Sequence, residues 1–331
     1  MIRNARVLLD DFLPREVVHR HEEMNRLAGA LEPVVAGDRP QDALLVGPSG
    51  AGKTCIARYS LDRLQEQALG VDTHYVDCWQ HSNRFRLLYK ILEGVGTTYD
   101  VHRSTPHDEL LRRLEELSDP YVIVLDEVDQ VEDKSLLREL YAIPEITMVL
   151  VANRERDVTG TLDERLRSRL RSGETIRFGR YSDEELVSIL EDRVRWGLDP
   201  DAVSRDQLDR IAAAAAGNAR DAISVLRLAA RDAQRDGADR ISDERIEAAI
   251  PAARREIRQK NAEKLSPHQR TVYDLLVEHG PLAPGDLYDR YRAAVDDPRT
   301  RRTIRSYLTK LERYNLVESE GEGPSRRYRS L

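Results

Sequence analysis

The sequence has no apolar run near the ~18 residues that a membrane-spanning helix needs, and its opening, MIRNARVLLDDFLP, has no signal-peptide core. We therefore expect a soluble, cytoplasmic protein with no membrane partner. Cysteine is also scarce. Cys55 and Cys78 have no metal-ligand spacing with any of the eight histidines, so we expect two ordinary buried thiols in a reducing compartment.

An excess of basic charge is also missing. The 331 residues contain 52 Lys and Arg against 59 Asp and Glu, a net charge of -7. This balance argues against a protein that coats nucleic acid indiscriminately, so any contact with DNA must be local. Only six of the basic residues are lysines, which a GC-rich genome or adaptation to high salt would each explain. Aromatic residues are only 5%, yet periodic Val, Leu, Ile and Ala indicate a globular chain of about two domains.

The stretch LLVGPSGAGKTCIARY, residues 44–59, has the order strand, loop, helix. Its spacing of Gly47, four residues, then Gly52, Lys53 and Thr54 fits a P-loop, in which backbone N–H groups and a helix N-terminus surround phosphates. Lys53 would contact the β and γ phosphates, and the Thr54 hydroxyl would bind Mg²⁺. The alternative is a glycine-rich turn before Lys-Thr. The predicted nucleotide-binding residues here are Gly47, Pro48, Ser49, Gly50, Ala51, Gly52, Lys53, Thr54 and Cys55.

Short apolar runs at 73–78, 121–125, 147–152 and 174–178 alternate with amphipathic helical stretches. This alternation predicts an α/β domain with a parallel sheet covered on both faces, ending near residue 180. Asp126 and Glu127 follow one such strand, where an open α/β sheet presents its ligands. Phosphoryl transfer needs a carboxylate to hold Mg²⁺ and a group to orient the attacking water, roles that suit Asp126 and Glu127 respectively.

From residue 181 the pattern is helical only. Ser182 and Glu185 predict a capping box, and the helices to residue 255 form an all-α subdomain. A charged connecting helix follows. The third predicted domain, residues 256–331, contains this connecting helix, three further helices and a hairpin around Gly321 and Gly323, and the last three helices with the hairpin have the order of a winged helix.

The last predicted helix, RTRRTIRSYLTKLERYNL, has Ile304, Tyr307, Leu308 and Leu311 on one face. The opposite face could lie in a DNA major groove, and the hairpin adds more arginines. The alternative is a winged helix used for protein contacts. The predicted DNA-binding residues are Arg302, Arg305, Ser306, Thr309, Arg313, Arg326, Arg327 and Arg329.

The motifs LDEVD, Asn153 in VLVANRERD, the arginines of LDERLRSRL and Arg220 in GNARDA resemble the Walker B, sensor 1, arginine-finger and sensor 2 elements of AAA+ ATPases. With LPREVVHRHEEMNRLAGAL before the P-loop and a winged helix at the end, the chain resembles the archaeal Orc/Cdc replication initiators over nearly its whole length. The resemblance implies an AAA+ base, a helical lid and a winged helix, with ATP and Mg²⁺ as ligands.

The resemblance also implies residue roles. Asn153 would polarise the attacking water, Arg220 would close on the γ-phosphate, and Arg169 or Arg165 would complete a neighbouring subunit's site. Leu13, Pro14, His19 and Arg20 would line the adenine pocket. Each arginine could instead be an ordinary surface residue. Residues 92–106, where the family has a DNA-contacting insertion, have few basic residues and could be an ordinary loop.

The expected function is ATP-dependent recognition of origin repeats in double-stranded DNA, with slow hydrolysis as a switch. The resemblance adds recruitment of the replicative helicase and self-association on DNA. Two alternatives use the same modules: a nucleotide-gated transcriptional regulator, and an ATPase that loads another protein ring.

Overall fold

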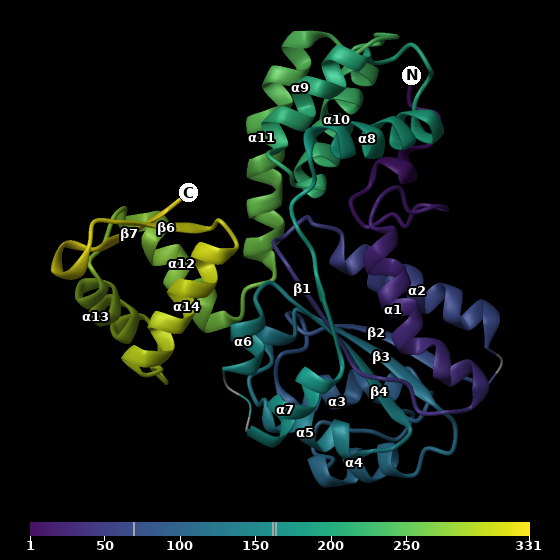
Figure 1. Cartoon of the computed structure of the whole chain (residues 1–331). Coiled ribbons are helices and arrows are strands. Elements are labelled where there is room, and N and C mark those ends of the chain that lie inside the picture. The colour runs from purple at the N-terminus through teal and green to yellow at the C-terminus, as the bar shows by residue number, and fades with distance from the viewer. Residues whose placement is uncertain (69, 161, 163) are drawn as a thin grey trace. The chain divides into compact units, whose positions relative to one another are not determined.

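The computed structural model describes residues 1–68, 70–160, 162 and 164–331, without the side chains of residues 165, 166, 169, 171 and 324. The chain forms two compact units, Met1–Ile250 and Pro251–Leu331 (Figure 1). The predicted division at residues 180 and 255 stays a prediction.

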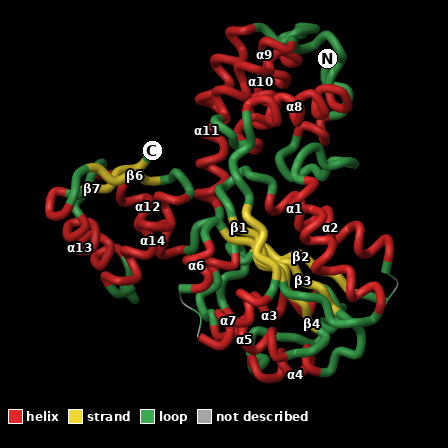
Figure 2. The backbone as a smooth tube through the Cα atoms, in the orientation of Figure 1, coloured by secondary structure: helices red, strands yellow, loops and turns green. Residues whose placement is uncertain are grey.

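The first unit is built on a parallel sheet with the strand order β2-β3-β4-β1-β5, which confirms the predicted parallel sheet (Figure 2). The strands are β1 (Ala43–Val46), β2 (Asp72–Asp77), β3 (Tyr121–Asp126), β4 (Ile146–Ala152) and β5 (Glu174–Arg177). Because β4 lies between β1 and β3, the residues that follow these three strands meet at one edge of the sheet.

Alternate residues of the buried strands pack against helices on opposite faces. Leu44, Ile123 and Leu150 share one core with α3 (Arg84–Glu93), α4 (His107–Glu115) and α5 (Ser135–Ala142). Leu45, Val124 and Val151 share the other with α1 (His21–Leu31) and α2 (Lys53–Gln67). The near-continuous apolar character of the strands follows from this two-sided burial. The remaining helices of this part are α6 (Glu155–Thr159) and α7 (Glu164–Ser172).

The named elements between β5 and residue 263 are helices only. They are α8 (Asp183–Gly197), α9 (Arg205–Ala215), α10 (Ala219–Arg235) and α11 (Asp243–Glu263). The predicted capping box is present: the Ser182 hydroxyl accepts from Glu185 N, and the Glu185 carboxylate accepts from Ser182 N. The sequence suggested a separate charged connecting helix, but that stretch continues α11 through Pro251. Strong helix formers on both sides of the proline account for the difference.

The second unit contains α12 (Pro267–His279), α13 (Pro284–Ala294), α14 (Arg301–Arg313) and the antiparallel hairpin of β6 (Val317–Glu320) and β7 (Arg327–Ser330). Leu282 and Tyr328 form an additional antiparallel bridge through two backbone hydrogen bonds of 2.9 Å. Three helices followed by a hairpin match the element order predicted for this region. Within the described ranges, no helix combines the length and apolar character that crossing a membrane requires.

Candidate nucleotide-binding site

The side chain of Lys53 is hydrogen-bonded to backbone carbonyls of its own P-loop. Lys53 is only 7% exposed. Its Nζ donates to Gly47 O at 2.7 Å, to Pro48 O at 2.8 Å and to Asn153 Oδ1 at 3.2 Å. Burial lowers the pKa of Lys53 to about 8, although the nearby charge of Asp126 opposes the shift. The contact with Asn153 brings the residue after β4 to the loop after β1. The predicted roles of Lys53 at the phosphates and of Asn153 at the attacking water require these two side chains to be neighbours.

Asp126 lies at the end of β3 with both carboxylate oxygens occupied. Oδ2 accepts from Thr54 Oγ1 at 2.7 Å and from the Tyr75 hydroxyl at 2.8 Å, and Oδ1 accepts from Glu127 N at 2.8 Å. Burial raises the pKa of Tyr75 well above its usual range, so the phenol remains a donor. The structure thus brings Thr54 and Asp126 together as predicted. It adds Tyr75, which the strand pattern of β2 gave no reason to select.

A hydroxyl and a carboxylate in contact are a donor set that Mg²⁺ accepts, because this ion usually takes one or two protein oxygens together with phosphate oxygens and water. The described residues contain no group of three or more His, Cys, Asp or Glu suited to a metal. Such a cluster is not needed for a nucleotide-bound Mg²⁺. Glu127 adopts a left-handed conformation with φ of 53°, at the turn directly after the strand.

The helical part of the first unit that begins at α8, called the lid from here on, contacts the P-loop through the start of α10. Asn218 caps this helix, since its Oδ1 accepts from Arg220 N at 3.0 Å and from Asp221 N at 3.3 Å. Ala219 N donates to Gly50 O at 3.1 Å. A Cβ on Gly50, whose φ is +74°, would lie 1.7 Å from Asn218 Oδ1. The phosphate loop and the lid helix are therefore in direct contact.

Arg220 lies in the first turn of α10 and is partly buried. Its positive charge contributes to the lowered pKa of Lys53, after burial. The predicted sensor arginine and the P-loop lysine are thus close enough to interact electrostatically.

The segment before α1 reaches the same region. The Arg20 guanidinium donates to Gly179 O at 2.6 Å and lies 4.1 Å from the centroid of the Tyr181 ring. His19 and Arg20 both have left-handed backbones, with φ of 66° and 65°. His19 Nε2 and Arg20 Nε are buried with no hydrogen-bond partner. Two adjacent residues of this kind mark a strained segment beside the P-loop.

Leu13 and Pro14, also predicted for the adenine pocket, are partly buried in the stretch that leads to His19. The two predicted arginine-finger candidates, Arg165 and Arg169, lie on α7, and their side chains are outside what the structure describes. Between them, Arg167 donates to Thr159 O and Leu162 O at 3.0 Å each, a contact that stabilises the helix locally.

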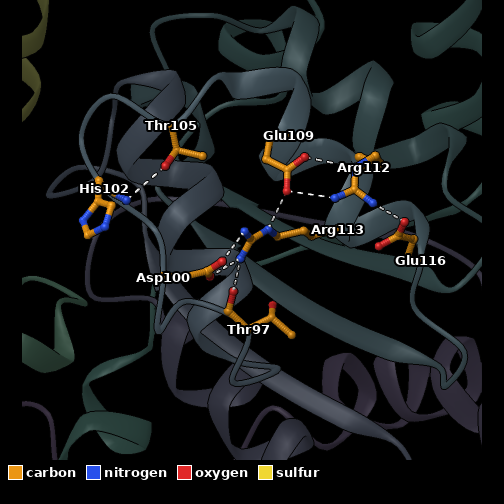
Figure 3. Close-up of polar contacts among 8 residues, drawn as sticks. All are labelled: Thr97, Asp100, His102, Thr105, Glu109, Arg112, Arg113 and Glu116. Atoms are coloured by element: carbon orange, nitrogen blue, oxygen red, sulfur yellow. Dashed lines mark hydrogen bonds and ion pairs between the residues drawn. The ribbon is translucent and has the colours of Figure 1, made fainter.

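The described residues 94–106 form turns and loop rather than a helical insertion. Arg113 holds this loop from α4, as Figure 3 shows. It donates to the two carboxylate oxygens of Asp100 at 2.6 and 2.9 Å, and to Thr97 O at 3.0 Å. Glu109 accepts from both Arg113 and Arg112, which completes an ion-pair network.

Few basic side chains of this region are available for DNA. Lys90 pairs with Glu93, whereas Arg103 is exposed. The DNA contact that the resemblance would place here has little support in this chain.

The α14 surface has the predicted polarity. Ile304, Leu308 and Leu311 are buried, whereas Arg302, Arg305, Ser306 and Thr309 are exposed and Arg313 is partly buried. The Thr309 hydroxyl donates to Arg305 O at 3.1 Å, within its own helix. The exposed Arg302 and Arg305 are therefore the side chains of this face that are most available to contact DNA.

The wing arginines differ among themselves. Arg329 Nε lies 2.8 Å from Glu320 Oε1, and its guanidinium also pairs with Glu318 across the hairpin. Arg326 and Arg327 are exposed and have no ion-pair partner among the described residues. Arg329 therefore stabilises the hairpin, and Arg326 and Arg327 are the better candidates for contacts with phosphate.

A parallel sheet with a P-loop after β1, an acidic pair after β3 and a helical lid on the loop defines the class of AAA+ nucleotide-binding proteins. A family model of the AAA domain matches residues 39–159, and one of the Cdc6 AAA+ ATPase-type lid domain matches residues 187–251. Over 330 residues the chain is 51% identical to ORC1-type DNA replication protein 9 of Halobacterium salinarum, covering 99% of this chain and 93% of that protein.

A second relative in the same organism, ORC1-type DNA replication protein 1, is 48% identical over 92% of this chain and 100% of its own length. The structure of the Aeropyrum pernix ORC1 protein in complex with DNA matches with a TM-score of 0.81 at 28% identity, covering 99% of this chain and 93% of that one. The chain belongs to the ORC1-type family of archaeal DNA replication proteins.

Proposed function

We propose that this chain is an ATP-dependent replication initiator that binds repeats in origin double-stranded DNA. It hydrolyses ATP slowly and uses the change of nucleotide as a switch. It also associates with further copies of itself on DNA and helps to recruit the replicative helicase. Membership of the ORC1-type family supports the role in replication, and the geometry of the site supports the use of nucleotide.

The observation that carries the proposal is the contact between the phosphate loop and the lid. Ala219 N donates to Gly50 O, and Arg220 in the next position lies near Lys53. A triphosphate that enters the loop meets lysine and arginine charges contributed by two different parts of the unit. The lid position therefore depends on what the loop holds.

The chain's residues take these roles in the proposed site. Lys53 donates to the β and γ phosphates, and the P-loop backbone N–H groups surround them. Thr54 and Asp126 hold Mg²⁺, which when bound supplies charge neutralisation. Glu127 orients the attacking water and accepts its proton, and Asn153 donates to that water. Arg220 stabilises the γ-phosphate, and Arg165 or Arg169 completes the site of a neighbouring copy.

The DNA-binding part of the proposal rests on the second unit. Residues 251–331 contain 17 Lys and Arg against 12 Asp and Glu, a net charge of +5, whereas residues 1–250 have a net charge of -12. The net positive charge of the chain is thus confined to the unit that contains α14 and the hairpin. The matching structure of the Aeropyrum pernix ORC1 protein is of a complex with DNA, which supports the same partner for this chain.

The alternative is a nucleotide-gated transcriptional regulator that uses the same modules. Isolation of bound fragments from the organism's genomic DNA, with the full chain and ATP, separates the two. An initiator should enrich a few loci that contain repeats, and Lys53→Ala should lose the dependence on ATP. Enrichment of many promoters without repeats would favour the regulator, and no enrichment over input DNA would contradict both.

A further inference from the structure

Arg193 is a buried charge for which the proposed site has no use. It lies on α8 and is 5% exposed. No carboxylate pairs with its guanidinium in the part of the chain that the structure describes. It donates to Val7 O at 2.8 Å and to Phe12 O at 3.1 Å, and it lies 4.9 Å from the centroid of the Phe12 ring. Burying a charge is costly unless the charge is paired and hydrogen-bonded, and here the partners of Arg193 are two backbone carbonyls and a ring.

Both carbonyls belong to a segment, residues 2–12, that is docked on the lid. Arg3 N and Asn4 N donate to Gly197 O, the last residue of α8, at 2.8 and 3.1 Å. Val7 and Leu8 are buried, and a Cβ on Gly197 would lie 3.1 Å from Leu8 Cδ2. The segment is therefore fastened to α8 by hydrogen bonds and by apolar packing.

The chain is fixed to the sheet domain soon afterwards. The α1 helix, which begins at His21, packs into the core shared with α2. Its Arg26 donates to the Glu174 carboxylate at 2.6 Å and to Thr175 O at 2.8 Å, both on β5. Residues 13–20 thus connect an anchor on the lid to an anchor on the sheet. They include His19 and Arg20, with their left-handed backbones and buried nitrogens without partners.

Arg193 also lies near the first turn of α2. Burial raises the pKa of Cys55 in that turn, and the positive charge of Arg193 acts against the shift. The Arg193 guanidinium therefore joins the lid to the N-terminal segment, and its charge also acts on the first turn of the helix that begins at the P-loop.

We propose that Arg193 is a positioning residue for the nucleotide base. By fastening residues 7–12 to α8, it holds residues 13–20 in place beside the P-loop helix for as long as the lid is docked. Opening of the lid then withdraws the base-binding segment, so that recognition of the base and closure of the lid form one event. The inference rests on the proposed ATP site and on the predicted adenine pocket of Leu13, Pro14, His19 and Arg20, which makes residues 13–20 the segment that contacts the base.

Arginine is the residue that this task requires. Its planar guanidinium presents several donors in fixed directions and can stack on an aromatic ring at the same time. Lysine keeps the charge but has a compact ammonium on a flexible stem. Arg193→Lys therefore tests the geometry of the contact and not its charge.

The experiment measures binding of MgATP and of inorganic tripolyphosphate to the full chain by calorimetry. Tripolyphosphate can use the P-loop but has no base. We expect Arg193→Lys to weaken ATP binding at least tenfold and to change tripolyphosphate binding less than twofold. Arg195→Lys, an exposed position on the same helix, is the matched control and should change neither. Trypsin should also cleave after Arg15 and Arg20 faster in Arg193→Lys than in the wild type.

Other outcomes overturn the inference in distinguishable ways. Equal weakening of both ligands would show that Arg193 only supports the fold. A wild type that binds ATP no more tightly than tripolyphosphate would remove the base pocket, and one that binds neither would refute the nucleotide site itself. If Arg193→Lys fails to fold, Phe12→Leu removes the ring and keeps the backbone carbonyl. Unchanged ATP affinity in Phe12→Leu would then overturn the proposal.

Discussion

Substitution of Gly50 by alanine tests the contact between the phosphate loop and the lid. The new Cβ would stand 1.7 Å from Asn218 Oδ1, so Asn218 must move. That oxygen caps α10 through Arg220 N and Asp221 N and cannot move without losing both hydrogen bonds. The hydrogen bond from Ala219 N to Gly50 O would also be stretched.

Three contributions set the size of the effect. Alanine at φ of +74° costs roughly 1 kcal/mol in backbone strain. Loss of the Asn218 cap costs about 1 kcal/mol, and loss of the Ala219 hydrogen bond about 1 kcal/mol. Gly50→Ala should therefore lower the free energy of unfolding by about 3 kcal/mol. Gly37→Ala is the matched control, because its φ is +83° and nothing lies within 4 Å of the added Cβ. It should cost only the strain.

Urea unfolding of the full chain without nucleotide, followed by circular dichroism, measures both variants. In an Asn218→Ala background, Gly50→Ala should become only as costly as Gly37→Ala, because the clashing atom and the cap are already gone. If Gly50→Ala and Gly37→Ala destabilise the wild-type chain equally, the P-loop and the lid helix are not in contact in solution.

Lys53→Ala should abolish ATP binding, whereas Glu127→Gln should bind ATP and lose turnover, since the amide cannot accept a proton. Calorimetry measures ATP binding, and phosphate release measures turnover. Equal loss of binding in both variants would make Glu127 structural. Burial lowers the pKa of Lys134 from 10.5 to about 8. The free-energy cost of burying its charge is therefore complete below pH 8, and it falls as the pH rises toward 10.5. The contribution of Lys134 to the free energy of unfolding should therefore rise with pH over that range. Urea titrations should find that the slope of unfolding free energy against pH is less positive in Lys134→Met than in the wild type, and identical slopes would contradict this. Arg302→Ala should cost roughly 1–3 kcal/mol of binding free energy on a preferred DNA site and relax the preference at one base position. Arg327→Ala should weaken binding to all sequences alike and reduce the slope of log K against log salt by about one. Uniform loss of affinity in both variants would remove the base-reading role of Arg302.

The fold was predictable where local patterns and burial agree. The apolar runs became strands, of which β1, β3 and β4 are buried throughout. The P-loop spacing placed Lys53 and Thr54 at the start of α2 because glycines are needed at this turn. The capping box of Ser182 and the polarity of α14 follow from helical spacing in the same way. These features depend on residues close together in the sequence.

The missed residues depend on distant contacts. Tyr75 reaches Asp126 only because β2 and β3 are neighbours in the sheet, an order that sequence periodicity does not contain. Arg193 reads as a charged residue on an amphipathic helix, and its burial and its hydrogen bonds to Val7 O and Phe12 O depend on the N-terminal segment, which is distant in the sequence. Arg329 is paired because the hairpin register places it opposite Glu318.

The glycines of the phosphate loop have a mechanical consequence. A Cβ on Gly47 would lie 2.4 Å from Phe178 O, and one on Gly52 would lie 2.4 Å from the Tyr181 hydroxyl. Both partners lie in the short connection between the sheet and the lid. A close-packed contact of this kind leaves no free space, so a shift of the loop by a few tenths of an ångström would require that connection to shift as well. The P-loop and the connection that leads from the sheet to the lid are therefore packed directly against each other.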